Sequence, residues 1–181
     1  MSEPLKSPDS RATAVWQRGP VPGYAAELQP AVHALLDVIE EIEMEVSDLS
    51  HAELWARPGG VASVGFHIVH VAGSTDRLFT YAMGDALSDE QRVYVKTEGT
   101  ALDPSVTAVA LSARMAESIR ASLHMLHRVT AASYQDIRYV GRARLESTVW
   151  GLLFHAAEHA SRHAGQLVTT SRMVRSGQVR R

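Results

Sequence analysis

The chain has 181 residues, of which 45% are hydrophobic, and this is enough for one domain with a substantial core. Its formal net charge of −2 provides no basic surface for a phosphate backbone, so nucleic acid is not an expected partner. Because cysteine is absent, disulfides and thiolate ligands are excluded, and any metal must be held by histidines and carboxylates.

The first 23 residues differ from the rest of the chain. They contain four prolines among polar residues, which predicts an irregular surface arm over 1–23 and one helical domain over 24–181. Trp16 is expected to anchor part of the arm. No apolar run approaches the roughly 20 residues that a membrane span needs, and the N-terminus has no apolar signal-peptide core. We therefore expect a cytoplasmic protein that does not contact a membrane.

Apolar residues recur at helical spacing in four segments, and a helix is predicted for each: 29–47, about 63–84, about 106–130 and about 147–175. Between the second and third helices, 85–104 is expected to be a polar linker with one helical turn near 89–95, and 134–145 is too short to predict a strand. Four amphipathic helices predict an all-α fold, a four-helix bundle, because each apolar stripe needs a partner.

Histidine is concentrated in two of these helices. The last one carries His155, His159 and His163 at spacings of four, and the second carries His67 and His70. Residues four apart share a helix face, so two imidazoles from the last helix and one from the second would make a three-histidine metal site with an open position. The spacing alone leaves the choice open, because His159 belongs to both possible pairs and either histidine of the second helix suffices.

Two motifs carry a family resemblance: His-x-x-x-His-x-Gly-Gln at 159–166, and Phe-His-Ile-Val-His-Val-Ala at 66–72. In this order they resemble the DinB-like superfamily, which includes YfiT-like proteins and mycothiol- or bacillithiol-dependent transferases. The resemblance implies a divalent metal, Zn²⁺ or Ni²⁺, held by His70, His159 and His163. It leaves His67 and His155 as neighbours of the site or parts of a pocket wall.

Three further side chains are pocket candidates. Ser74 and Arg77 follow His70 on the same helix face, and Glu158 precedes His159. No catalytic residue is assigned. The other four histidines, His33, His51, His124 and His127, are read as ordinary structural side chains.

The resemblance implies a metal-dependent enzyme acting on a small molecule, either a thiol S-transferase or a hydrolase that uses a metal-activated water. The expected partners are a small-molecule substrate or a low-molecular-weight thiol, and a second copy of the chain in a homodimer. The alternative is a non-enzymatic metal-binding or stress-response module that serves for dimerisation. A third possibility is a polar seam in the bundle with no ion.

Overall fold

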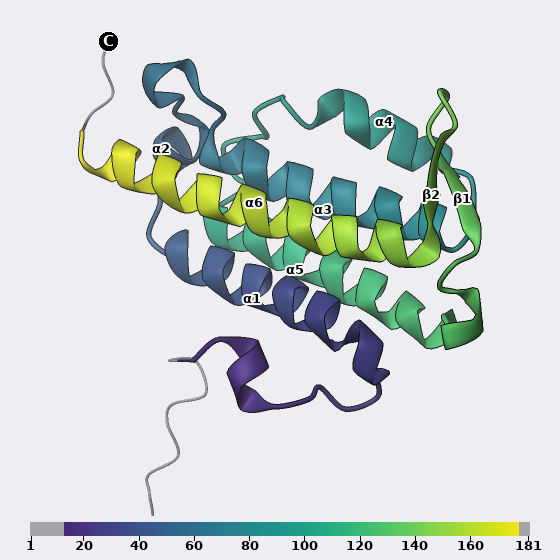
Figure 1. Ribbon diagram of the computed structural model, residues 1–181. Helices are drawn as coiled ribbons and strands as arrows, with labels where there is room; N and C mark the ends of the chain where they lie inside the picture. The colour runs from purple at the N-terminus through teal and green to yellow at the C-terminus, as the bar shows by residue number, and fades with distance from the viewer. Residues whose placement is uncertain (1–12, 178–181) are drawn as a thin grey trace, which may run out of the picture.

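The computed structural model describes residues 13–177. Four long helices lie side by side, α1 (Gln29–Glu45), α3 (Val64–Ala82), α5 (Ala108–Met125) and α6 (Val149–Arg175) (Figure 1). Helices α1 and α6 run in one direction and α3 and α5 in the other, and α1 and α3 each pack against both α5 and α6. The predicted all-α four-helix bundle is confirmed.

Side-chain caps fix where the later helices begin. Ser63 Oγ accepts a hydrogen bond from the backbone N–H of Phe66 at 3.1 Å, and Thr107 and Thr148 cap α5 and α6 in the same way. Each cap satisfies a backbone donor that the first turn leaves unpaired. The cap at Ser63 sets the register of α3, and therefore the direction in which its histidines project.

The core lies between the four long helices. Aliphatic and aromatic side chains from all of them are fully buried, among them Leu35, Ile39, Ile42, Ile68, Phe79, Met115, Ile119, Leu153 and Leu167. Burial of such side chains stabilises the fold by about 1.5–3 kcal/mol each. The bundle is thus a rigid frame on which the polar side chains of α3 and α6 are displayed.

The connection from α3 to α5 crosses back over the bundle. Because these two helices run in the same direction, residues 83–107 must return along the molecule, and they do so through α4 (Asp89–Thr97), which lies along α3 (Figure 1). The expected single turn near 89–95 is therefore too short. A Ser88–Gln91 capping box begins the helix, and Gln91 Nε2 then donates to Asp76 Oδ2 and Thr80 Oγ1 of α3.

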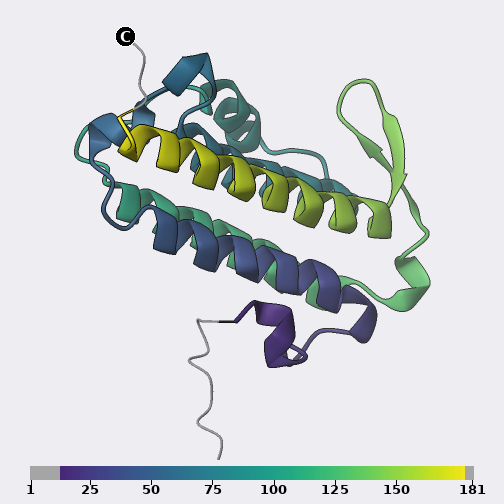
Figure 2. The ribbon, with the colours of Figure 1, turned by 60° about the vertical axis from the view of Figure 1, so that its left-hand side comes forward.

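A hairpin spans residues 137–148, where the sequence pattern predicts no strand. Strands β1 (Ile137–Val140) and β2 (Leu145–Thr148) pair antiparallel, and the hairpin projects from the end of the bundle where α6 begins (Figure 2). Its outward-facing apolar residues obscure the alternation typical of a half-buried strand, since Leu145 is 64% exposed. The third predicted helix also ends earlier than expected, at Met125, and a 3-10 turn follows it.

The short elements pack at the edges of the bundle. Helix α2 (His51–Trp55) begins at the Ser50 cap and packs on α3. Of the predicted arm, residues 1–12 lie outside the described residues, and 13–23 include a 3-10 turn at Val15–Arg18. That turn is held by the buried side chain of Val15 and by an ion pair from Arg18 to Glu40, whereas Trp16 is 63% exposed and does not anchor it. No helix in the described part of the chain is long and apolar enough to span a bilayer.

Replacing Leu35 by Ala tests the core. Leu35 is fully buried in α1, so the substitution leaves a cavity and lowers the free energy of unfolding by about 2–5 kcal/mol in urea titrations. Met44 on the same helix is 68% exposed, and Met44→Ala is the matched control, with an expected change within about 0.5 kcal/mol. Equal losses for the two variants would contradict this packing.

Candidate metal centre

Four histidines meet between α3 and α6. His70 Nε2 lies 2.9 Å from His159 Nε2, and His67 Nδ1 lies 2.9 Å from His163 Nδ1. The ring centroids of His70 and His159 each lie 4.5 Å from that of His163. The histidine cluster, as these four residues are called below, therefore joins side chains almost a hundred positions apart in the sequence.

Three members of the cluster have the geometry of metal ligands. One ring nitrogen each from His70, His159 and His163 lies within 4.8 Å of the other two. Three imidazole nitrogens at such separations can converge on one divalent ion with small side-chain adjustments, and they leave a fourth position open. These three side chains could hold a metal.

Small residues allow α6 to approach its neighbours at this point. The alanines of α6 that precede and follow the ligand positions are buried, at 156, 157, 160 and 164. Short side chains at a helix interface permit close backbone approach, so the longer imidazoles can meet across it. The spacing of four between His159 and His163 then places both rings on the side that faces α3.

The surroundings of His67, His159 and His163 favour their neutral forms. Burial, reinforced by the neighbouring histidines, lowers the pKa of His67 and of His163 to about 4, and it also lowers the pKa of His159. A neutral imidazole keeps the lone pair that a metal requires, whereas a protonated one does not. The donor set therefore fits a divalent ion at neutral pH.

Glu98, which the sequence analysis did not single out, fixes the orientation of His70. Its carboxylate Oε2 accepts a hydrogen bond from His70 Nδ1 at 2.8 Å, and Oε1 accepts one from Arg77 at 2.5 Å. Burial acts to raise the pKa of Glu98, but the hydrogen bonds from His70 and Arg77 outweigh it and hold that pKa below its ordinary value. Since a carboxylate can only accept, His70 carries its proton on Nδ1 and presents the Nε2 lone pair to the cluster.

A sequence signal for Glu98 did exist. Ser88 and Gln91 form a capping box, and a helix that begins there places Gln91, Tyr94 and Glu98 on one face, at spacings of three and four. The spacing of these residues does not show which other helix this face contacts. The contact between Glu98 and His70 depends on how the crossover connection returns along α3.

His67 contacts the ring of His163 through the Nδ1 atoms of the two side chains. It is only 4% exposed, and its Nδ1 shares one proton with Nδ1 of His163. When His163 donates that proton, its Nε2 is left as the nitrogen that can accept a metal. His67 is thus in contact with one of the three candidate ligands.

The remaining predicted site residues lie in different surroundings. Arg77 belongs to the Glu98 contact, whereas the Ser74 hydroxyl donates to the carbonyl of Val71 within its own helix. Glu158 is bound by Arg162 on the outer face of α6, and the side chain of His155 is 53% exposed, 3.7 Å from Glu158. The structure therefore brings Arg77 to the cluster and leaves Ser74, Glu158 and His155 outside it. The ring of His155 is tilted against that of His159, with 5.6 Å between the ring centroids.

A hollow of about 530 Å³ adjoins the cluster at His67. Gln166, Thr169 and Thr170 of α6 line it, together with Val61 in the segment that precedes α3. A space of this size accommodates a small organic molecule beside the histidines.

Comparison with known protein families matches the part of the chain that contains the histidine cluster. The sequence profile of the DinB superfamily matches residues 13–167, a range that contains all four histidines of the cluster. A search of curated proteins finds no match.

The lowered pKa values predict how the metal-free protein responds to acid. Unfolding returns His67 and His163 to a pKa near 6.5, so between about pH 6.5 and 4 the unfolded chain binds more protons. The free energy of unfolding therefore falls with decreasing pH in that window, by about 1 kcal/mol per pH unit for each histidine. Urea titrations in the presence of a chelator measure this slope.

The His67→Gln variant should show a shallower slope than the wild type. His124→Gln, on the solvent-facing side of α5, is the matched control and should keep the wild-type slope. If the slope is unchanged by His67→Gln, burial of this imidazole does not contribute to the pH dependence.

Proposed function

The chain belongs to the DinB superfamily, whose members typically bind metal, and from this premise we propose that it binds one divalent ion through His70, His159 and His163 and acts as a thiol-dependent S-transferase. Zn²⁺ or Ni²⁺ is the proposed ion. The observation that carries the proposal is the convergence of three imidazole nitrogens within 4.8 Å of one another.

Each residue of the cluster has a distinct part in this proposal. His70, His159 and His163 hold the ion, Glu98 keeps the Nε2 lone pair of His70 directed at it, and His67 supports the ring of His163. When bound, the ion lowers the pKa of a small-molecule thiol and so favours the nucleophilic thiolate form.

The hollow beside His67 supports a thiol as the co-substrate. Its volume of about 530 Å³ holds a small organic molecule next to the cluster. Val61, Ala62 and Met173 form an apolar part of its wall, and Gln166, Thr169 and Thr170 add amide and hydroxyl groups. In this proposal Gln166 and Thr170 hydrogen-bond the polar substituents of the thiol, and the electrophile meets its sulfur at the open position.

The proposed ligands predict a change in metal content. His159→Ala removes a ligand, and the purified, tag-free variant should lose the stoichiometric metal that the wild type retains in elemental analysis. Its helical circular dichroism should persist, because alanine is a strong helix former. His155→Ala, one turn away on the same helix and exposed, is the matched control and should keep the metal. Stoichiometric metal in His159→Ala would overturn the ligand assignment.

The contact between Glu98 and His70 predicts a change in metal affinity. Replacing it by Gln removes the anionic acceptor of the His70 proton, and metal affinity should fall by about 10- to 100-fold in a competition titration against a chromophoric chelator. Glu90→Gln, on the same helix and away from the cluster, should bind metal as the wild type does. Equal affinities for the two variants would show that the carboxylate does not orient the ligand.

Activity is tested by incubating the metal-loaded protein with low-molecular-weight thiols and a chlorinated aromatic electrophile. Metal-dependent release of chloride with formation of the thioether supports the S-transferase. Metal-dependent hydrolysis of ester substrates without any thiol would favour the hydrolase instead. Absence of turnover in both assays, with metal bound, would indicate the non-enzymatic binding module.

A further inference from the structure

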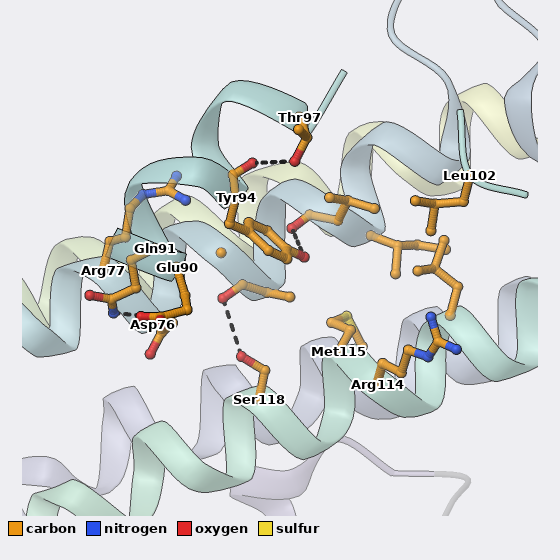
Figure 3. A pocket seen from close by; sticks show the side chains of 15 residues that line it. Asp76, Arg77, Glu90, Gln91, Tyr94, Thr97, Leu102, Arg114, Met115 and Ser118 are labelled. Atoms are coloured by element: carbon orange, nitrogen blue, oxygen red, sulfur yellow. Dashed lines mark hydrogen bonds between the residues drawn. The ribbon is translucent and has the colours of Figure 1, made fainter. Parts of the chain in front are cut away.

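A second cavity adjoins α3, and it shares Arg77, the partner of Glu98, with the surroundings of the histidine cluster. It has a volume of about 370 Å³ and is lined by residues of α3, α4 and α5 (Figure 3). Apolar side chains from α3, α5 and the 98–107 connection form much of its wall: Ile68, Val69, Ala72, Leu102, Leu111 and Met115. None of the four clustered histidines lines it.

Most polar side chains of this cavity are already engaged with the protein. Tyr94 Oη donates to the carbonyl of Val69 at 3.1 Å, and Gln91 Nε2 donates to Asp76 Oδ2 at 2.7 Å. Ser118 Oγ donates to the carbonyl of Ala72, and Arg77 is held by Glu98. These groups shape the wall and have little capacity left to recognise a ligand.

Arg114 is the exception. Among the described residues that line the cavity, it is the one charged side chain without a hydrogen bond or ion pair to another described residue. In Figure 3 its guanidinium group lies at the same end of the cavity as Leu102, beyond Met115. A guanidinium with five free donors beside an apolar wall is suited to bind a carboxylate.

The charges are distributed unevenly along the cavity. Asp76 and Glu90 lie at the opposite end from Arg114, with Tyr94 between the two ends (Figure 3). Arg77 lies at the same end as Asp76, but its charge is already paired with Glu98. A second anionic group at the Asp76 end would meet like charge, which disfavours dianions. The occupant that fits is therefore a molecule with an apolar body and a single anionic group at one end.

The cover of the cavity is attached through few contacts. None of the nine residues of α4 is fully buried, and the helix is held on α3 mainly by the polar contacts of Gln91, Tyr94 and Glu98. The Glu98 contact ties the end of α4 to His70, so that end of the helix stays in place. Arg114 is exposed, and a ligand can therefore enter at the Arg114 end of the cavity while α4 and the four-helix bundle stay intact.

We propose that this cavity is a binding site for a small amphipathic monoanion, whose apolar body packs on Met115 and Tyr94 and whose carboxylate pairs with Arg114. This site is separate from the histidine cluster, and it does not depend on the proposed S-transferase activity. Its ligand class is that of aryl- or alkyl-carboxylates.

The first experiment compares three probes of the same shape by isothermal titration calorimetry. 4-Phenylbutyrate should bind saturably, whereas the neutral 4-phenylbutanol should bind about five- to tenfold more weakly and 4-phenylbutylamine more weakly still. Arg114→Gln should weaken binding of the carboxylate by a similar factor and leave binding of the alcohol unchanged. Arg120→Gln, an exposed arginine of α5 that does not line the cavity, is the matched control.

The second experiment locates the probe by NMR of ¹³C-methyl-labelled methionine. Met115 lines this cavity and Met173 lines the hollow beside His67, so the two methyl signals distinguish the sites. We expect 4-phenylbutyrate to shift Met115 and not Met173, and to bind the His159→Ala variant as tightly as the wild type. Because that variant lacks a proposed metal ligand, retained binding excludes a carboxylate bound to the ion.

Three results would overturn the proposal. They are the absence of saturable carboxylate binding to the wild type, equal affinity for Arg114→Gln and the wild type, and a shift confined to Met173. None of them bears on the metal content of His159→Ala, so failure of this proposal and failure of the proposed function are distinguishable.

Discussion

The contact between α3 and α6 is the constraint on which the candidate centre depends. It places His70 Nε2 2.9 Å from His159 Nε2 and brings His67 against His163. Partial or full removal of His67, His159 and His163 from water disfavours their charged forms and lowers the pKa of each. Such a cluster adds little hydrophobic stabilisation, but a bound ion would stabilise the folded state through its affinity.

The direction of the helices explains where the supporting carboxylate comes from. Since α3 and α5 run in the same direction, their connection has to return along the bundle, and α4 carries Glu98 to His70 and Arg77. Gly73 makes this approach possible, because a Cβ there would lie 2.5 Å from Tyr94 Cε1 and 2.6 Å from Glu98 Oε1. The same short helix covers the cavity between α3 and α5, so one crossover connection shapes two parts of the molecule.

Helical periodicity and the Ser63 cap were enough to predict the bundle, because each long helix buries one apolar stripe in a common core. Histidine spacing predicted which helices meet, although it could not choose between His155 and His163, and the family resemblance made that choice. The contact of Glu98 with His70 could not be predicted, since it is made across 28 residues of chain and depends on how the crossover connection returns along α3. The hairpin was missed because Ile137 and Leu145 face outward and hide the strand pattern.

The central claim is that three histidines leave an open position on a divalent ion at which a thiol can bind. Substitution with Co²⁺ makes this position visible, because the absorption spectrum of cobalt reports its ligands. We predict one equivalent of tightly bound cobalt, with a new sulfur-to-cobalt charge-transfer band that grows saturably as a small-molecule thiol is added. A protein that binds no cobalt, or one whose cobalt spectrum does not respond to thiol, would contradict the account.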